Sequence, residues 1–195
     1  MKIAIIGGTF NPPHMGHLLL AEEVLNELGY DRVLFIPSNK PAHKTVDGDV
    51  SASQRMEMVR LAIGDRNNIQ LEACEILRGG VSYSIDTVNC VLQCYDLDDK
   101  PGLVIGDDLF QGFDTWKDAR VLGQKADLIV AHRLFNHKLD FPYPHTYLNN
   151  KILPLSSSEI RERIRYGKPW RSLVPEGVYH YINDQKLYLQ GDGCE

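Results

Sequence analysis

The residues best suited to chemistry in this chain lie close to its N-terminus. Residues 6–17 read Ile-Gly-Gly-Thr-Phe-Asn-Pro-Pro-His-Met-Gly-His. Glycine has no Cβ, so the backbone at Gly7 and Gly8 can approach a ligand closely. His14 and His17 stand three residues apart where a helix is expected to begin, so both rings can reach one anion at the helix N-terminus. The segment predicts a site for a nucleotide polyphosphate.

A second segment, residues 155–161, has the same preference for phosphate. It reads Leu-Ser-Ser-Ser-Glu-Ile-Arg and is expected to open a helix. A helix cap explains one serine and the glutamate, but not all three hydroxyls and the arginine. Ser156, Ser157 and the forked N–H donors of Arg161 would suit phosphate oxygens.

The loop over residues 37–44 carries three potential cations, Lys40, His43 and Lys44. A solvated loop is the simpler interpretation. Its expected place after the second strand brings it near the glycine turn, where His43 and Lys44 could serve a second phosphate.

Three further features could belong to the same site. Ser84 follows a glycine pair at the start of an expected helix, where it could cap the helix or help receive a carboxylate or amide. Asp108 follows Gly106 at a strand end, and could take a ribose hydroxyl, orient a metal-bound water or merely form the turn. Trp116 could pack in the core or offer its face to an aromatic ring.

Composition places the chain among soluble globular proteins. It has 195 residues, 43% hydrophobic and 24% charged, which suits one domain. We expect that domain over residues 1–190 and a flexible tail over 191–195. No apolar run approaches the ~20 residues of a membrane span, and the N-terminus resembles a first strand rather than a signal peptide, so we expect a cytoplasmic protein.

Charge and cysteine content exclude other classes. The net charge of −5 disfavours broad binding to nucleic acid or a membrane surface. The four cysteines form no Cys-x-x-Cys pair and are expected to be reduced thiols. A metal site built from His14, His17 and cysteines is an alternative that would require stoichiometric zinc.

Strand-like and helix-like segments alternate, which predicts an α/β fold with a doubly wound parallel sheet. Ligands bind such sheets at the carboxyl ends of the strands. The segment 134–150 is either a flap or a surface excursion. We expect strands at 3–6, 33–36, 69–73, 103–105, 128–131 and 152–155, and helices at 18–28, 53–63, 84–95, 116–122, 157–166 and 175–184.

Together these residues resemble the HxGH nucleotidyltransferases and, within them, the bacterial nicotinate-nucleotide adenylyltransferases. Residues 7–17 match the glycine and HxGH signature, and residues 156–161 match the Ser-Ser-Thr-x-Ile-Arg signature, with Ser158 in place of threonine. Residues 37–44, 82–87, the spacing from Gly106 to Trp116, and residues 174–188 point to the nicotinate branch.

The resemblance implies a Rossmann-like fold with a small C-terminal helical portion, and the joining of ATP to nicotinate mononucleotide with release of pyrophosphate. It implies Mg²⁺ arriving with ATP, and no metal ligands on the protein. The implied catalytic residues are His14, His17, Lys44 and Arg161. The implied ATP-binding residues are Gly7, Gly8, Thr9, Phe10, Gly106, Asp108, Arg133, Ser156 and Ser157, and the implied mononucleotide-binding residues are Asn39, His43, Ser84 and Trp116.

Two rival functions remain open at this point. Pantetheine-phosphate adenylyltransferase, or another HxGH nucleotidyltransferase, would share the histidines and Arg161 but not the Trp116 and 82–87 segments. A non-catalytic nucleotide sensor could use the same scaffold, although a sensor need not place donors on a leaving group.

Overall fold

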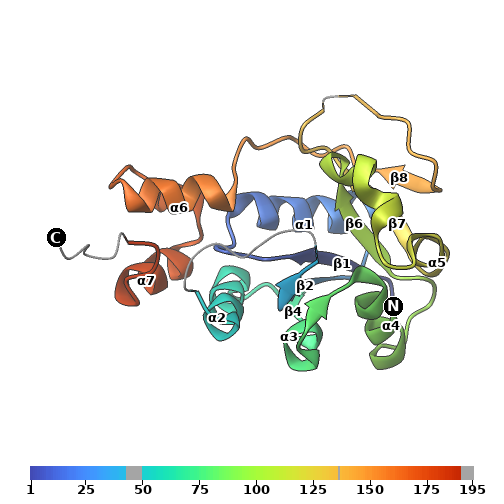
Figure 1. The fold of residues 1–195 in the computed structure, drawn as a ribbon, viewed down its shortest axis with the longest axis horizontal. Helices are drawn as coiled ribbons and strands as arrows, with labels where there is room; N and C mark the ends of the chain where they lie inside the picture. Colours follow the sequence, from blue (N-terminus) through green and yellow to red (C-terminus); the bar gives the residue numbers. More distant parts are fainter. Residues whose placement is uncertain (43–49, 136, 190–195) are drawn as a thin grey trace.

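A parallel sheet forms the centre of the computed structural model, which describes residues 1–42, 50–135 and 137–189 (Figure 1). Its six strands run in the order β4-β2-β1-β6-β7-β8, and all their pairings are parallel. Because β1 lies between β2 and β6, the order reverses beside β1, where such sheets bind ligands. The strands are β1 Ile3–Gly8, β2 Arg32–Pro37, β4 Ile69–Leu71, β6 Gly102–Gly106, β7 Asp127–Ala131 and β8 His145–Tyr147.

Helices follow most strands, and a short pair, β3 (Lys40–Pro41) and β5 (Val81–Ser82), lies outside the main sheet. The α-helices are α1 Met15–Leu28, α2 Ala52–Ile63, α3 Cys74–Arg78, α4 Ser84–Cys94, α5 Ala119–Lys125, α6 Ser157–Arg165 and α7 Glu176–Asp184. Two 3₁₀ segments are η1 Asp107–Thr115 and η2 Arg171–Leu173.

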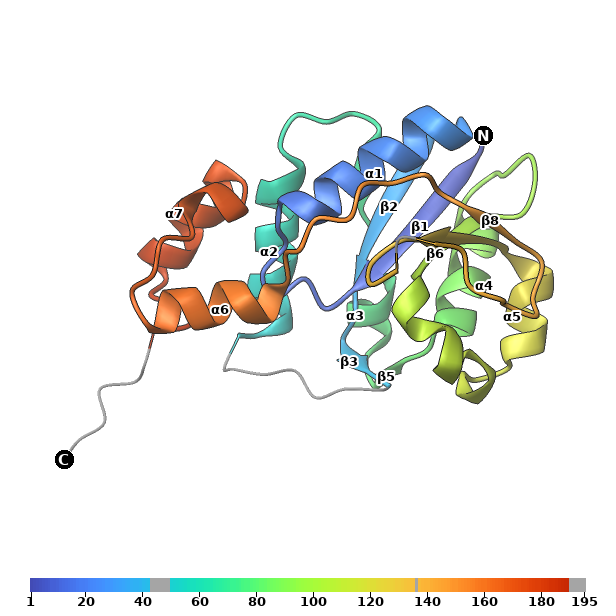
Figure 2. The ribbon, with the colours of Figure 1, turned by 90° about the horizontal axis from the view of Figure 1, so that it is seen from above.

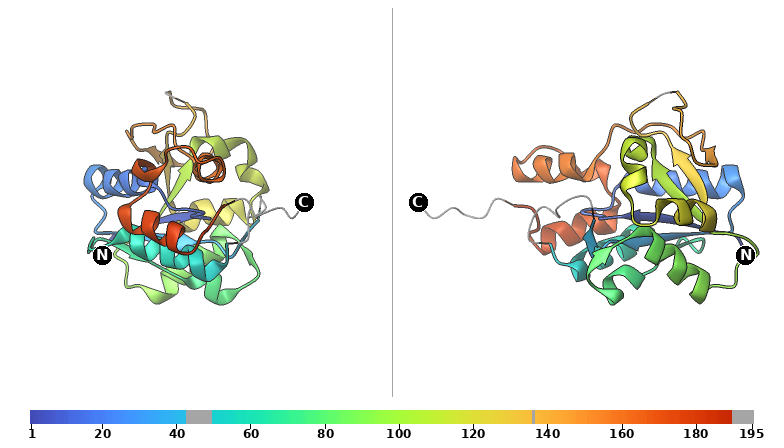
Figure 3. Two further views of the ribbon diagram at one scale, coloured as in Figure 1. Left: turned by 90° about the vertical axis from the view of Figure 1, so that its left-hand side faces the viewer. Right: turned by 45° about the vertical axis from the view of Figure 1, so that its right-hand side comes forward.

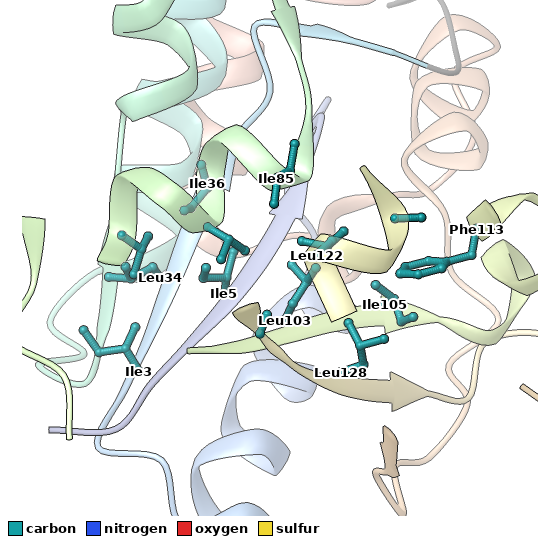
Figure 4. Close-up of a cluster of buried hydrophobic side chains, with 14 of the residues drawn as sticks. Ile3, Ile5, Leu34, Ile36, Ile85, Leu103, Ile105, Phe113, Leu122 and Leu128 are labelled. Carbon is teal, nitrogen blue, oxygen red and sulfur yellow. The ribbon is translucent and has the colours of Figure 1, made fainter. Parts of the chain in front are cut away.

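Alternating side chains of the strands build two cores, one on each face of the sheet. Ile3 and Ile5 of β1 pack with Ile85 of α4 and Leu122 of α5 (Figure 4). Their neighbours Ala4 and Ile6 belong to the opposite cluster, which includes residues of α1. Helices therefore cover both faces, which confirms the doubly wound architecture.

The C-terminal helices pack on α2 rather than on the sheet centre. A third cluster joins Met58 of α2 to Ile160 and Ile164 of α6 and to Val178 and Ile182 of α7. Two perpendicular views show α6 and α7 together at one end of the molecule (Figures 1 and 2), and the left panel of Figure 3 looks onto this end. This is the small C-terminal helical portion that the resemblance implied.

Several predicted boundaries are wrong. Residues 152–155 form no strand, and the sixth strand is instead β8, within the expected loop 134–150. The helix expected at 116–122 begins only at Ala119, after η1. Ser84 is the first residue of α4, and Tyr83 is its N-cap, so Ser84 does not cap the helix. The tail predicted over 191–195 lies outside the described residues.

Helix lengths bear on one further expectation. No helix in the described part of the chain is both long and apolar enough to cross a membrane.

Candidate active site

A cavity of about 830 Å³ opens at the carboxyl ends of β1 and β6. It has the size of a typical small-molecule site. Segments from both ends of the chain line it. Of the predicted site residues, Gly7, Gly8, Thr9, Phe10, His14, His17, Ser84, Gly106, Asp108, Trp116, Arg133, Ser156, Ser157 and Arg161 lie in its wall.

The two histidines of the HxGH segment meet at the start of α1. Their ring centroids are 3.7 Å apart, and the His14 backbone N–H donates to His17 Nδ1 at 3.1 Å. A Cβ on Gly16 would lie 3.1 Å from the His14 ring, which is tighter than most real contacts. The glycine between the histidines therefore leaves room for the His14 ring.

The two imidazoles are not equivalent. Burial, and secondarily the positive charge of Arg133, lower the pKa of His14 to about 4. His14 is consequently neutral near pH 7 in the absence of an anion.

Phe10 holds the turn between β1 and α1. Its φ of 50° lies in the left-handed region, which costs a non-glycine residue about 1 kcal/mol or more. Its ring, 2% exposed, packs against Phe35 at 5.2 Å and His17 at 4.9 Å between centroids. Phe10 thus supports His17 from the core side.

The start of α6 reaches across to the same turn. Ser156 caps the helix by accepting from the Glu159 N–H at 3.1 Å, while the Ser157 hydroxyl donates to the Pro12 carbonyl at 2.8 Å. Arg161 donates to the Asn11 carbonyl at 2.8 Å and to Ser158 Oγ at 3.2 Å. The second signature is therefore joined to the first through main-chain carbonyls.

The end of β6 carries a network of carboxylates. The buried Asp107 carboxylate accepts from the backbone N–H groups of Arg133, Leu134 and Phe135 at 3.0–3.3 Å. Asp108 pairs with the Arg133 guanidinium at 3.1 Å. A Cβ on Gly106 would collide with both of these side chains, which explains the glycine there.

The predicted mononucleotide side is only partly assembled by the described residues. Asn39 is not in the cavity wall, and its amide instead donates to the Gly80 carbonyl at 2.9 Å. Trp116 lines the cavity and packs on Phe113 at 5.1 Å between ring centroids. His43 and Lys44 lie outside the described residues.

Lys117, the residue after Trp116, is held by two contacts of its ammonium group. Its ammonium pairs with Asp86 at 3.0 Å and lies 4.9 Å from the centroid of the Tyr83 ring. Lys117 and Tyr83 both line the cavity next to Trp116.

Three polar contacts, each involving a buried residue, were missed from the sequence. Arg55 of α2, 2% exposed, donates to the Thr9 and Asn39 carbonyls. Glu75, in the cavity wall, accepts from the Thr87 hydroxyl. Tyr188, near the C-terminus, donates to Asn11 Oδ1 at 2.6 Å. Arg55 does have a sequence signal, because it occupies an apolar-stripe position with Met58, Val59 and Ala62.

The parallel sheet therefore carries histidine, serine and arginine donors around one cavity at the carboxyl ends of its central strands. A family model described as cytidylyltransferase-like matches residues 5–163. The probable nicotinate-nucleotide adenylyltransferase of Borreliella burgdorferi is 47% identical over 190 residues, 97% of this chain and 98% of the relative. That of Treponema pallidum (strain Nichols) is 38% identical over 202 residues, covering 96% and 99%. The chain belongs to the nicotinate-nucleotide adenylyltransferase family.

Solved structures are similar to the fold over nearly the whole chain. The nicotinic acid mononucleotide adenylyltransferase of Plasmodium falciparum, complexed with NaAD, matches with a TM-score of 0.77 at 18% identity, covering 96% of this chain and 97% of that one. A structure from Vibrio parahaemolyticus, titled as that of a putative nicotinate-nucleotide adenylyltransferase, matches with a TM-score of 0.66 at 22% identity, covering 98% of both chains.

Proposed function

We propose that this enzyme transfers the adenylyl group of ATP to the 5′-phosphate of nicotinate mononucleotide, giving nicotinate adenine dinucleotide and pyrophosphate. The observation that carries the proposal is the convergence of His14, His17 and Arg161 on one cavity beside Gly7 and Gly8. Relatives up to 47% identical with matching length carry the same activity in their names.

The reaction needs no nucleophile from the protein. A 5′-phosphate oxygen attacks the α-phosphorus of ATP in line, and the bond from that phosphorus to the bridging oxygen breaks as pyrophosphate leaves. The protein therefore contributes positioning and charge stabilisation.

We assign the triphosphate contacts to His14, His17 and Arg161. Because His17 Nδ1 accepts from the His14 backbone, the ring proton of neutral His17 lies on Nε2, the nitrogen that would donate to phosphate. His14, neutral before binding, would gain a proton more readily once a phosphate lies beside it. Arg161 adds a permanent charge, and Lys44 would extend this set.

The other residues of the cavity are assigned to ATP or to the mononucleotide. Gly106, Asp108, Arg133, Ser156 and Ser157 would surround the adenosine and its phosphates, with Gly7, Gly8, Thr9 and Phe10 forming the turn beneath them. Ser84 and Trp116 would face the mononucleotide, together with Asn39 and His43.

Mg²⁺ would be held by the phosphates rather than by a protein cage. The Asp107 carboxylate is engaged by backbone N–H groups and Asp108 by Arg133. Among the described residues, no group of three or more His, Cys, Asp or Glu side chains is placed to hold a metal. When bound with ATP, the ion would offset negative charge on the phosphates.

A panel of acceptors tests the proposal. Purified protein with ATP is expected to release pyrophosphate with nicotinate mononucleotide, and more slowly with nicotinamide mononucleotide or pantetheine phosphate. Pyrophosphate release with pantetheine phosphate alone would favour the rival transferase. ATP binding without release on any acceptor would favour the sensor.

A further inference from the structure

A single buried arginine joins the two loops that follow β1 and β2. Arg55 Nη1 donates to the Thr9 carbonyl at 2.8 Å, and Nη2 donates to the Asn39 carbonyl at 3.3 Å. Thr9 belongs to the glycine turn assigned to ATP, and Asn39 to the loop assigned to the mononucleotide. We propose that Arg55 is a positioning residue that couples occupancy of the two substrate subsites, an inference that rests on the proposed function.

Arg55 occupies a buried position of α2 where an apolar residue would be expected. Arg55, Met58, Val59 and Ala62 share the buried stripe of the helix, and Arg55 is 2% exposed. A guanidinium is costly to bury. Its charge is offset in part by the Glu75 carboxylate, which lies in the cavity wall. Placing an arginine here gains two directed donors that an apolar side chain lacks.

Each hydrogen bond sets the orientation of a peptide unit next to the cavity. The C=O and N–H of a trans peptide point in opposite directions. Holding the Thr9 carbonyl therefore also orients the N–H of Phe10, whose ring supports His17. Holding the Asn39 carbonyl likewise orients the Lys40 N–H at the start of β3.

The two loops are also joined directly. The Ser38 N–H donates to the Gly8 carbonyl at 2.8 Å. The Asn39 N–H donates to Ser82 Oγ at 2.9 Å, which links the second loop to β5. The planar guanidinium of Arg55 contacts both loops. A ligand that orders one loop therefore also favours the bound position of the other loop.

The coupling is measured by calorimetry on the full chain. The probes are nicotinate mononucleotide and an ATP analogue with a methylene group between the α- and β-phosphates. In the wild type, we expect a saturating amount of the analogue to tighten mononucleotide binding at least about fivefold, the lower end of ordinary coupling between sites. We express this coupling as the ratio of the mononucleotide Kd without the analogue to the Kd with it. Arg55→Lys keeps the positive charge but lacks the two directed donors of the guanidinium, so this ratio should fall close to one.

Arg60→Lys is the matched control. Arg60 lies on the exposed side of α2 and pairs with Glu57 at 2.6 Å, so its variant should keep the wild-type ratio. Steady-state kinetics add a second readout: in Arg55→Lys, KM should rise for both substrates, whereas a defect in one subsite would raise only one.

Each outcome decides the role of Arg55. An unchanged ratio in Arg55→Lys, or a ratio of one in the wild type, overturns the proposal. If Arg55→Lys and Arg55→Gln both fail to fold, the residue is structural and the proposal is also wrong. If the wild type uses a different acceptor, the proposed function fails, and the same ratio measured with that acceptor still tests Arg55.

Discussion

The two histidines of the first signature differ in environment although they lie 3.7 Å apart between ring centroids. Close packing of two imidazoles disfavours two positive charges. Burial keeps His14 neutral, and the hydrogen bond from the His14 backbone orients His17. The pair is therefore better described as two oriented donors than as two fixed cations.

Replacing His17 with alanine removes one donor from the assigned triphosphate site. Removal of one such donor costs about 3 kcal/mol of transition-state stabilisation, or about a hundredfold in turnover. We expect this loss in kcat for His17→Ala, measured by pyrophosphate release, with an unchanged circular dichroism spectrum. His180→Ala, at an exposed position of α7, is the control. Turnover within a few-fold of the wild type would remove His17 from the mechanism.

The lowered pKa of His14 makes stability depend on pH. Between the unfolded value of 6.5 and the folded value of about 4, the unfolded chain binds a proton that the folded chain excludes. The free energy of unfolding therefore falls as pH falls through this window.

The contribution of His14 to the pH dependence of stability can be measured against a variant that has no titrating side chain at position 14. Relative to His14→Gln, the wild type should lose about 2 kcal/mol of stability between pH 7 and pH 5, followed by urea unfolding. The comparison cancels carboxylates common to both proteins. A constant difference across this range would show that His14 titrates normally.

At the scale of elements, sequence periodicity predicted most of the parallel sheet because buried strands form continuous apolar runs. It was wrong at residues 152–155, which are apolar but not paired in the sheet. Nearby backbone N–H groups of Asn149 and Lys151 instead donate to Glu27 and Glu23 of α1. The short, polar β8 lacks the apolar run that would have identified it.

Candidate site residues could be predicted where a short sequence segment carries the chemistry, and were missed where a single side chain contacts a residue distant in sequence. His14, His17 and Arg161 could be identified from their types and spacing. Arg55 and Tyr188 act on Thr9 and Asn11, far away in sequence. Nothing in the identity of those distant residues indicates that a buried donor will reach them.

Gly106 tests how closely the end of β6 is packed. Its φ of −77° is open to any residue, so only the added Cβ matters, and that atom would displace Asp108 and Arg133. We expect Gly106→Ala to retain its fold while KM for ATP rises about fivefold, the equivalent of a lost ion pair of about 1 kcal/mol.

Gly112→Ala in η1 is the matched control, because a Cβ there meets nothing within 4 Å. It should leave KM for ATP unchanged. Equal kinetic constants for both glycine variants would show that the Asp108–Arg133 pair does not contribute to ATP binding.

At the scale of the whole molecule, the last forty residues of the described chain complete the turn after β1. Ser157 contacts the Pro12 carbonyl, Arg161 the Asn11 carbonyl, and Tyr188 the Asn11 side chain. Arg55 of α2 donates to the Thr9 carbonyl in the same turn. The turn is therefore held by α2 and by the C-terminal segment, which pack together in the third hydrophobic cluster. The C-terminal helical portion is thus part of the active-site framework.

Tyr188 makes the most distant of these contacts, and its own backbone, at a φ of 65°, lies in the left-handed region. Tyr188→Phe removes only the hydroxyl that donates to Asn11, which is 2% exposed. Loss of one hydrogen bond to a buried side chain costs about 1 kcal/mol, so chemical unfolding should show a loss of that size. Because Arg161 contacts the same asparagine, kcat should fall several-fold as well. Tyr166→Phe, at an exposed position, should change neither quantity. A loss of stability with normal kcat would limit the C-terminal segment to a structural role, separate from positioning of the catalytic turn.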